Sequence, residues 1–510
     1  MDPLLPPGDW DAMRAAFRWA VPERANLARV CCDDHPEDAP AIVDLSDGRR
    51  VWTFGDLRSA SEALAAHLAA RGVGRGDRVA ILMPQRAEVI VAHLAAWRLG
   101  AVSLPLFALF GPEALDYRLR DSGAAAVVGT GLEVLDGLDL PDLRVRVDAD
   151  ALPTGGRVGC ADTLSEDPAV MIYTSGTTGE PKGVLHAHRF LWGHLPCIEA
   201  GYAGAPRAGD VGWTPADWAW IGGLMDLALP CLAYGVPVVA KRFSKFDAAE
   251  AFALMAAEGV TLAFVPPAAL RAMRRVAAPP MRLRAVISGG EALGADLLGW
   301  GRGALGCPIN EIYGQTEVNL VTAACDGSQD RVPGTLGRAV PGVAVEVMGA
   351  DGPVGDGTVG EIAVRGSPAA FLRYWNKPEA TGAKWRDGWI LTGDLGERVC
   401  GPEGSPVIRY HARDDDVINS SGYRIGPTEI ETCLCAHPAV HAAAVVGLPD
   451  PDRGEAVTAF VVADAVEAEA LVAWVRARLS PHMAPRAVHF REALPVTATG
   501  KVMRRALREG

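Results

Sequence analysis

The stretch RVAILMPQRAEVIVAHLAAWRLGAVSLPL, from Arg78 to Leu106, joins two short apolar runs through a longer amphipathic segment. The first run, Arg78–Pro84, has the length and composition of a buried strand, and Ala101–Leu106 has the same features. Between them, Ala87–Gly100 carries apolar residues at helical spacing and stops at a glycine. Strands that alternate with helices in this way predict a parallel sheet covered on both faces, which is an α/β architecture.

Further short apolar runs continue this pattern along the chain. They are AAAVVG (124–129), AVMIY (169–173), LAFVPP (262–267) and RAVISGG (284–290). Near residues 330–400 the composition shifts to glycine, proline and short alternating runs, such as PGVAVEVMGADGPVGDGTVGEIAVRG. This shift predicts the hairpins of a small β-rich subdomain.

A polar break, HARDDDVINSSGYRI (411–425), precedes a compact tail whose length of about one hundred residues is within the usual range for a domain. The tail contains two strand-like runs, AAAVVG (442–447) and AVTAFVV (456–462), and one helical segment, AEALVAWVRARLS (468–480). The apolar face of that helix consists of Leu471, Trp474, Val475 and Leu479. We place the boundary before the tail at residues 414–416.

The overall composition is that of a folded globular chain. Of the 510 residues, 49% are hydrophobic and 22% are charged, which is consistent with a large buried core. The net charge of −13 argues against a nucleic-acid partner and against an anionic membrane surface. The N-terminus lacks the features of a signal peptide, and the longest apolar stretch, Leu227–Ala240, is too short for a membrane span. We therefore expect a cytoplasmic protein.

The ten cysteines are scattered along the chain, which favours reduced thiols over a disulfide framework. One cluster, CLCAHPAVH (433–441), combines two cysteines with two histidines. Its C-x-C spacing differs from that of zinc sites, so we interpret it as a helix that covers a domain face.

The stretch YTSGTTGEPKG, Tyr173–Gly183, has the chemistry of a polyphosphate cradle. Its glycines allow backbone N–H groups to approach a ligand closely, and its hydroxyl groups and Lys182 can bind phosphate oxygens. It differs from a Walker A loop, because Lys182 is followed by glycine instead of serine or threonine. Taken alone, the stretch has a flexible linker as its alternative interpretation.

This loop resembles the phosphate loop of the adenylate-forming (AMP-binding) superfamily, which includes acyl-CoA synthetases, carrier-protein-loading adenylation domains and firefly luciferase. Four further stretches resemble motifs of that family in the same order along the chain. They are NEIYGQTE (310–317), DGWILTGDLG (387–396), RDDDVINSSGYRIGPTEIE (413–431) and PVTATGKVMRRALRE (495–509). Together with FALFGPEALDYRLRDSGA (107–124), the pattern is most similar to the medium-chain acyl-CoA synthetases.

The resemblance implies two domains and a hinge. The expected fold is α/β, with a large N-terminal domain of parallel and mixed sheets, helices and a β-rich subdomain, and a small, mobile α+β C-terminal domain. Residues 1–413 would bind AMP and the acyl group, and residues 417–510 would form a lid that carries a catalytic lysine. The hinge would be Asp415, within 414–416.

The resemblance also implies sites for ATP and Mg²⁺. Tyr313 would stack on the adenine, Asp394 would accept hydrogen bonds from the ribose hydroxyls, and Glu317 would hold the metal. Thr316 would contact the α-phosphate. The full set of expected ATP- and AMP-binding residues is Thr174, Ser175, Gly176, Thr177, Thr178, Lys182, Gly290, Glu291, Glu311, Ile312, Tyr313, Thr316, Asp394, Arg413 and Arg424.

For catalysis the resemblance implies Lys501, together with Thr316 and Glu317. The carboxylate of the acid attacks the α-phosphorus of ATP and expels pyrophosphate, and cations offset the repulsion between the two anions. The lid then turns, withdraws Lys501 and admits the thiol of coenzyme A, the cosubstrate. The expected CoA-binding residues are Ser421, Gly422 and Tyr423.

The acyl pocket is expected to include Trp220, Ile221, Val265, Gly290 and Gly314. In acetate-specialised relatives a tryptophan stands at the position of Gly314, so the missing side chain predicts room for a longer acid. The surrounding stretches, 214–235 and 264–273, contain no obvious buried cation. We therefore expect a medium-chain or branched aliphatic acid, or a small aryl acid, and a role in fatty acid metabolism.

Three alternatives stay open at this stage. A stand-alone ligase that loads a carrier protein shares the same motifs, although no carrier domain follows Lys501. A luciferase-like oxygenase shares the first step. An inactive nucleotide-binding regulator is disfavoured, because Lys182, Glu317, Asp394 and Lys501 are all present. The identity of the acid and the oligomeric state, monomer or homodimer, are open as well.

Overall fold

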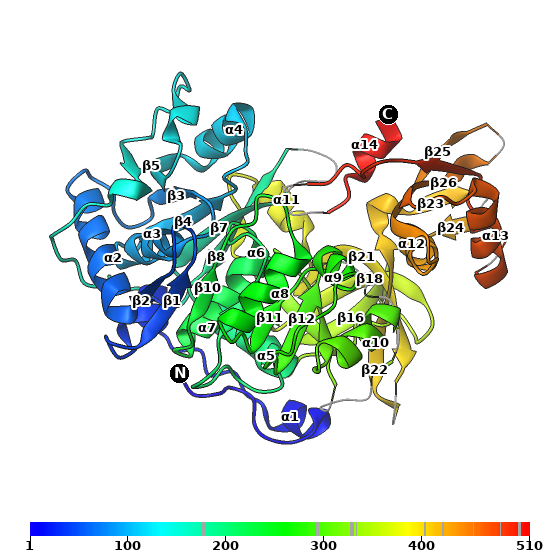
Figure 1. Cartoon of the computed structure of the whole chain (residues 1–510), viewed down its shortest axis with the longest axis horizontal. Coiled ribbons are helices and arrows are strands. Elements are labelled where there is room, and N and C mark those ends of the chain that lie inside the picture. The colour runs from blue at the N-terminus through cyan, green and yellow to red at the C-terminus, as the bar shows by residue number, and fades with distance from the viewer. Residues whose placement is uncertain are drawn as a thin grey trace.

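The structure is a computed structural model of the whole chain. It describes residues 1–174, 180–290, 293, 295–326, 331–332, 334–401, 404–420, 423–451, 453–479, 481–497 and 501–509, without the side chains of residues 295, 296, 415, 423 and 424. Figure 1 shows a large body formed by most of the chain and a smaller C-terminal domain, in orange and brown, at one side of it.

The predicted strand–helix–strand unit lies at the centre of a seven-stranded sheet. β3 (Arg78–Leu82) and β4 (Val102–Leu106) are parallel neighbours, and α3 (Ala87–Arg98) connects them. The helix ends two residues before the predicted stop, because Gly100, at φ +65°, turns the chain back towards the sheet. The other strands are β19 (Arg373–Tyr374), β8 (Lys182–Ala187) and β7 (Pro168–Thr174) beyond β4, and β5 (Ala124–Gly129) and β6 (Val145–Asp148) beyond β3.

A nine-stranded sheet forms the second half of the large body. Its spatial order is β15 (Arg338–Ala339), β14 (Asn319–Ala324), β13 (Ile309–Gln315), β12 (Ala285–Gly289), β11 (Leu262–Phe264), β9 (Gly212–Trp213), β10 (Val238–Ala240), β1 (Pro40–Asp44) and β2 (Arg50–Thr53). The six strands from β13 to β1 are parallel, whereas β14, β15 and β2 pair antiparallel at the two ends. The prediction of parallel and mixed sheets is confirmed.

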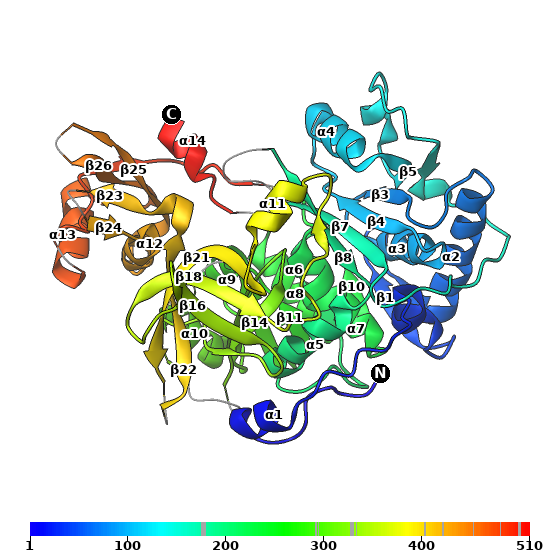
Figure 2. The ribbon, with the colours of Figure 1, turned by 180° about the vertical axis from the view of Figure 1, so that it is seen from behind.

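Helices fill the space between these two sheets and cover their outer faces, as Figures 1 and 2 show. The shared core contains α2 (Phe54–Ala69), α3, α5 (Phe190–Gly201), η4 (Leu224–Ala228) and α7 (Leu229–Ala233). The outer face of the nine-stranded sheet is covered by α8 (Ala248–Ala257), α9 (Pro267–Met273) and α10 (Ala295–Ala304), and that of the seven-stranded sheet by α4 (Pro112–Ser122). The short helical segments of the large body are α1 (Trp10–Ala16), η1 (Arg29–Asp33), η2 (Leu132–Leu135), η3 (Ala149–Ala151), α6 (Ile221–Gly223) and α11 (Pro378–Ala383).

The predicted β-rich region forms an antiparallel sheet of its own. Its strands are β17 (Gly352–Pro353), β16 (Ala344–Gly349), β18 (Val359–Arg365), β21 (Trp389–Cys400), β20 (Trp385–Arg386) and β22 (Pro406–Arg413). Its apolar face, with Val347, Ile362 and Ile408, packs against Tyr313 of β13. This contact joins the β-rich sheet to the nine-stranded sheet.

The C-terminal domain has a core of its own. Its strands are β24 (Tyr423–Ile425), β23 (Ile418–Ser420), β26 (Gly454–Ala463), β25 (Val440–Asp450) and β27 (Ala487–Phe490). Its helices are α12 (Pro427–Cys435) and α13 (Ala468–Arg478), which pack on one face of the sheet, and α14 (Arg504–Glu509), which packs on the other. Leu471 and Val475 of α13 are buried as predicted. We expected residues 433–441 to form a helix. Cys433 and Cys435 do lie in α12, but His441 lies in β25, so the prediction is wrong for the end of this segment.

All ten cysteines are free thiols. Within the described ranges, no helix combines the length and the apolar character that a bilayer crossing requires.

A buried ion pair fixes the N-terminal segment against α3. The Arg98 guanidinium, in a residue that is 1% exposed, contacts both carboxylate oxygens of Asp33 at 2.9 and 2.5 Å. Burial alone would raise the pKa of Asp33, but the hydrogen bonds from Arg98 hold that pKa below its ordinary value. The pair therefore contributes stability that is present above the ordinary pKa of an aspartate and is lost as the pH falls below it.

We expect Arg98→Met to lower the free energy of unfolding by about 3–5 kcal/mol near neutral pH, because Asp33 loses its main partner. The difference from the unmodified chain should shrink as the pH falls below about 4, because the unfolded chain then binds a proton on Asp33 that the native ion pair with Arg98 excludes. Urea unfolding followed by circular dichroism measures both effects. The control is Arg24→Met, which removes an exposed pair with Asp162 and should leave the midpoint nearly unchanged. Equal midpoints for the two variants would contradict the role given to Arg98.

Candidate active site

A cavity of ≈ 2070 Å³ lies where the large body meets the C-terminal domain. Its lining includes Tyr313 of β13, Asp394 of β21 and, from the C-terminal domain, Lys501. The parallel strands β12 and β13 end at this cavity. It therefore occupies the edge of the sheet, beyond the carboxyl ends of the strands, where open α/β sheets bind their ligands.

Asp394 is the centre of a buried hydrogen-bond network and is itself 5% exposed. Its Oδ2 accepts hydrogen bonds from the Tyr313 hydroxyl at 2.7 Å and from Gln315 Nε2 at 2.6 Å, and Arg413 lies 3.4 Å from Oδ1. Tyr313 and Gln315 point the same way because they are two residues apart on one strand. Burial and the adjacent carboxylate raise the pKa of Tyr313, so its hydroxyl stays protonated and donates.

Glu317 lies in the tight turn that joins β13 to β14. The turn closes at Asn319, whose φ of +54° is a left-handed conformation that asparagine tolerates better than most residues. Glu317 Oε1 accepts a hydrogen bond from the Tyr374 hydroxyl at 2.6 Å. The ring of Tyr374 lies 5.1 Å from Lys182 Nζ, within the range of a cation–π contact. Tyr374 therefore connects Lys182 to Glu317.

The predicted phosphate loop joins two antiparallel strands. β7 continues to Thr174, β8 begins at Lys182, and these two residues are direct partners in the ladder. The loop thus follows the end of β7 and leads into its antiparallel partner strand, β8. Thr174 and Lys182 both line the cavity.

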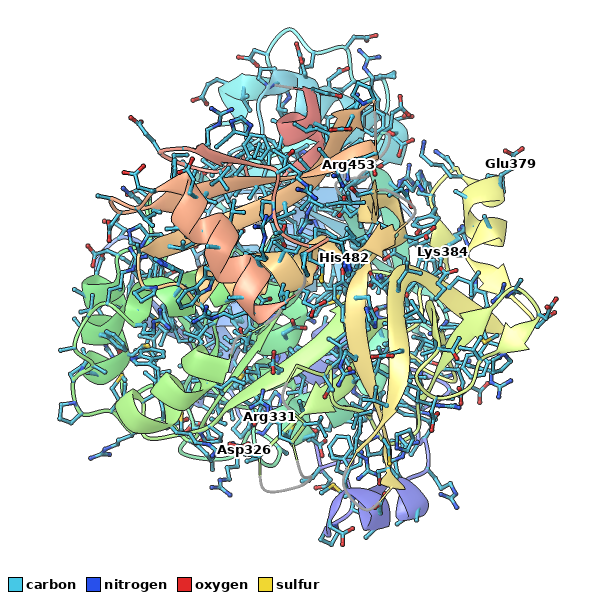
Figure 3. All side chains as sticks on the ribbon, turned by 90° about the vertical axis from the view of Figure 1, so that its right-hand side faces the viewer. Asp326, Arg331, Glu379, Lys384, Arg453 and His482 are labelled. Atoms are coloured by element: carbon cyan, nitrogen blue, oxygen red, sulfur yellow. The ribbon has the colours of Figure 1, made fainter. Side chains whose placement is uncertain are left out.

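Lys384 supplies a cation that the sequence analysis did not identify. Its ammonium group donates to the carbonyls of Leu391 and Thr392 at 3.0 and 3.1 Å, just before Asp394 in β21. Burial lowers the pKa of Lys384, and the nearby carboxylate of Glu317 opposes that effect. Figure 3 shows Lys384 beside the strands of the β-rich sheet. Lys384 thus adds a third cation to Lys182 and Arg413 at this end of the cavity.

Lys501 reaches the cavity from the C-terminal domain. Its Cε lies 3.9 Å from the point that a Cβ would occupy on Gly290, and Cζ2 of Trp220 lies 3.7 Å from the same point. Gly290 has a φ of +95°, a conformation that disfavours any side chain there. The backbone of Lys501 is held by Thr497, which exchanges two hydrogen bonds with it. Lys501, Gly290 and Trp220 therefore meet at one place in the cavity.

Three of the five residues expected in the acyl pocket line the cavity, and two do not. Trp220, Gly290 and Gly314 line the cavity, whereas Val265 is buried in the core under α8–α10 and Ile221 packs against the central core. Arg271 and Arg274, at the end of α9, also line the cavity. Arg271 is half-buried and Arg274, which lies just outside the stretch 264–273, is exposed, so neither is the buried cation that the sequence analysis looked for.

Gly314 is required for a reason that differs from the open tunnel inferred from the sequence. A Cβ at this position would lie 1.7 Å from the carbonyl oxygen of Asn319 and 2.9 Å from Cα of Leu320. The ladder between β13 and β14 shifts register here, and the two backbones approach closely. The backbone of β14 occupies the space that a side chain would need, so the missing side chain does not by itself open an acyl tunnel.

Other predicted nucleotide-binding residues also line the cavity. They are Glu311, Ile312, Thr316 and Arg413. Both carboxylate oxygens of Glu311 are already bonded, one to the N–H of Leu293 and one to Arg331. The predicted residues Ser175, Gly176, Thr177, Thr178, Glu291, Ser421 and Gly422 lie outside the described residues, as do the side chains of Asp415, Tyr423 and Arg424.

A charge cluster ties the last helix to the predicted domain boundary. Arg504 of α14 donates to both carboxylate oxygens of Glu431 at 2.8 Å and to Asp416 at 3.2 Å. Arg508 donates to the other oxygen of Asp416 at 3.1 Å. Because Arg504 follows Lys501 by three residues, the cluster also anchors the segment that carries Lys501.

Two sequence models of known protein families match this chain. The sequence model of AMP-binding enzymes matches residues 28–375, and that of the AMP-binding enzyme C-terminal domain matches residues 429–501. The chain belongs to the AMP-binding enzyme family. The adenylate-forming resemblance inferred from the motifs is confirmed.

Individual relatives are similar to this chain over most of their length. The acyl-coenzyme A synthetase ACSM4, mitochondrial, of Homo sapiens is 32% identical, over 90% of this chain and 84% of the relative. ATP-bound MatB from Rhodopseudomonas palustris has a TM-score of 0.84 at 29% identity, covering 95% of this chain and 98% of that one. A benzoate CoA ligase from Burkholderia xenovorans LB400 has a TM-score of 0.83 at 28% identity, covering 95% and 100% of the two chains.

Sequence reasoning missed three residues of the site. Gln315 stands inside the quoted motif 310–317, and its spacing of two from Tyr313 could have indicated a shared strand face. Tyr374 and Lys384 stand just outside the motifs, in RYWNKPEAT and AKWRDGW. The available signal for Lys384 was its position between an apolar and an aromatic residue, directly before the Asp394 motif.

We expect Gly314→Ala to lower the free energy of unfolding by about 2–3 kcal/mol, because the added methyl group meets the backbone of β14. Thermal unfolding monitored by fluorescence, with and without ATP, measures the loss. Gly299→Ala is the control: it adds a methyl group to an exposed position of α10 with no neighbour within 4 Å and should stabilise by about 0.5–1 kcal/mol. Unchanged stability of Gly314→Ala would show that β14 can move aside.

Proposed function

We propose that the chain is an AMP-forming acyl-CoA synthetase. It activates a carboxylic acid with ATP as an acyl-adenylate and then transfers the acyl group to the thiol of coenzyme A. One observation carries this proposal: Lys501 of the C-terminal domain enters the same cavity as the Tyr313–Asp394 network and stands next to Trp220. A cation between a nucleotide-type site and an apolar surface suits the joining of a carboxylate to an α-phosphate.

The network around Asp394 supports the nucleotide roles. We assign the adenine to the face of Tyr313 and the ribose hydroxyls to Asp394, whose Oδ1 is contacted at 3.4 Å by Arg413. Lys182 and Thr174 are assigned to the terminal phosphates and Thr316 to the α-phosphate. The excess of cations around the two carboxylates favours a polyanionic ligand.

Glu317 suits Mg²⁺ because that ion usually takes one or two carboxylates and completes its shell with phosphate oxygens and water. In the described part of the chain no group of three or more His, Cys, Asp and Glu side chains is arranged for a metal, which is consistent with a metal that arrives with ATP. When bound, the ion would neutralise phosphate charge. Glu317 would hold it through the oxygen that Tyr374 leaves open.

The reaction then follows from charge and position. The acid carboxylate attacks the α-phosphorus, a new C–O–P bond forms, and pyrophosphate leaves with the electron pair of the broken P–O bond. Lys501 offsets the charge that accumulates on the non-bridging oxygens. In the second step the CoA thiol, as its thiolate, attacks the acyl carbon and AMP leaves.

We further propose that the C-terminal domain moves between the two steps, with residues 414–416 as the hinge. The present position of Lys501, inside the cavity, suits the first step. The contact between the domains includes a hydrogen bond of 2.5 Å between Arg275 and His441, an exposed interaction that can break at small cost. The cluster around Arg504 would carry Lys501 along with the domain.

The proposed acid is a medium-chain, small branched or small aryl acid. Trp220 offers an aromatic surface beside Lys501, and the buried ring of Phe264, with its centroid 5.6 Å away, supports Trp220 from the core. Selectivity should be graded, because each methylene group buried against such a surface contributes only ~0.8 kcal/mol.

The test is AMP release from ATP and Mg²⁺ for acids from acetate to dodecanoate, for branched acids and for benzoate, with and without CoA. The proposal expects AMP release that requires both an acid and CoA, with the highest kcat/KM for acids longer than acetate. Pyrophosphate exchange that depends on the acid, without turnover on CoA, would indicate a carrier protein as the acceptor. Nucleotide binding with no AMP release for any acid would indicate an inactive regulator.

We expect Lys501→Ala to reduce adenylate formation ~100- to 1000-fold, because a charge that stabilises the transition state is lost. Transfer to CoA from supplied acyl-AMP should persist, since Lys501 acts only in the first step. Pyrophosphate exchange and thioester formation measure the two steps separately. Lys245→Ala, which removes an exposed lysine outside the cavity lining, is the control. Equal loss of both steps would contradict this division.

A further inference from the structure

The chain around Tyr374 bridges two parts of the site through its backbone. The N–H of Phe371 donates to the carbonyl of Glu317 at 2.8 Å, and the N–H of Trp375 donates to the carbonyl of Gly183 at 2.7 Å. Tyr374 lies between these two anchors. Its backbone is therefore fixed relative to both the Glu317 turn and the start of β8.

The side chain of Tyr374 makes the same bridge a second time. Its hydroxyl donates to Glu317 Oε1 at 2.6 Å, and its ring faces Lys182 Nζ at 5.1 Å. Among the described residues, this is the one side-chain hydrogen bond of the Glu317 carboxylate, which lines the cavity and keeps Oε2 without a bonded partner there.

Packing alone does not explain this arrangement. A tyrosine that only filled space would direct its hydroxyl to solvent or to the backbone, whereas Tyr374 restrains one oxygen of a cavity-lining carboxylate. Mg²⁺ demands near-ideal octahedral geometry, so a ligand whose orientation is fixed beforehand loses less freedom on binding. The ring meanwhile limits where the flexible lysine can place its charge.

We propose that Tyr374 is a positioning residue for metal-bound ATP. Its hydroxyl orients Glu317 towards the metal, and its ring orients Lys182 towards the phosphates. The inference rests on the proposed function, because it takes ATP and Mg²⁺ as the ligands. It predicts that the hydroxyl and the ring have separable effects, the first on the metal and the second on the nucleotide.

Three variants separate these effects. Tyr374→Phe removes the hydroxyl and keeps the ring, and Tyr374→Leu removes both. Tyr234→Phe is the matched control, because the Tyr234 hydroxyl also donates to a glutamate, Glu199, outside the cavity lining. Calorimetric ATP binding in EDTA, calorimetric ATP binding across a Mg²⁺ titration, and the melting temperature are measured for each full-length protein.

For Tyr374→Phe we expect an unchanged ATP dissociation constant in EDTA and a roughly tenfold rise in the Mg²⁺ concentration at half-effect, as for the loss of a hydrogen bond to a charged group. Tyr374→Leu should in addition weaken ATP binding in EDTA several-fold. Tyr234→Phe should lower the melting temperature and leave both binding constants unchanged.

A Mg²⁺ midpoint of Tyr374→Phe equal to that of the unmodified chain would overturn the inference, even if its melting temperature falls. So would an equal loss of ATP affinity with and without metal. An unmodified chain that binds ATP equally well in EDTA and in Mg²⁺ would overturn the proposed metal site as well, and one that binds no ATP would overturn the proposed function. AMP release by the unmodified chain distinguishes the last two cases from failure of the Tyr374 inference alone.

Discussion

The site depends on one buried carboxylate. Asp394 belongs to the β-rich sheet, whereas Tyr313 and Gln315, which donate to it, belong to the nine-stranded sheet. A carboxylate that is almost fully buried is costly without such partners, so the two sheets close favourably only in the register that supplies them. The same register sets the turn that carries Glu317, which follows Gln315 by two residues. The hydrogen bonds that join the two sheets thus also form the wall of the cavity.

Positive charge gathers near this joint from distant parts of the sequence. Lys182, Lys384 and Arg413 come from three separate strands or loops, and each is held by a partner: an aromatic ring, two carbonyls and a carboxylate. Cations that stand this near to one another repel, and burial already lowers the pKa of Lys384. An anionic ligand relieves that repulsion, so occupancy of the cavity and stability of the folded state are linked.

The fold was more predictable from the sequence than the site. The strand–helix–strand unit at Arg78–Leu106 depends on the spacing of apolar residues and on a terminating glycine, and both are local features of the sequence. Asp394 lies in a recognisable motif. Val265 was assigned to the pocket wrongly, because neighbouring residues of an extended segment face opposite ways and only the packed sheet shows which way is inward. Lys384 and the contacts of Gly314 depend on how segments far apart in the sequence approach each other.

The close approach of Gly314 to Asn319 constrains how this protein can evolve. A larger residue at 314 meets the backbone of β14 before it meets any substrate, so one mutation there first reduces stability. A bulky side chain at residue 314 therefore needs an earlier substitution near Asn319 that shifts β14. That earlier substitution must not reduce stability while residue 314 is still glycine. The effect of a substitution at residue 314 is therefore epistatic: the order in which residues 314 and 319 change decides whether the folded chain stays stable.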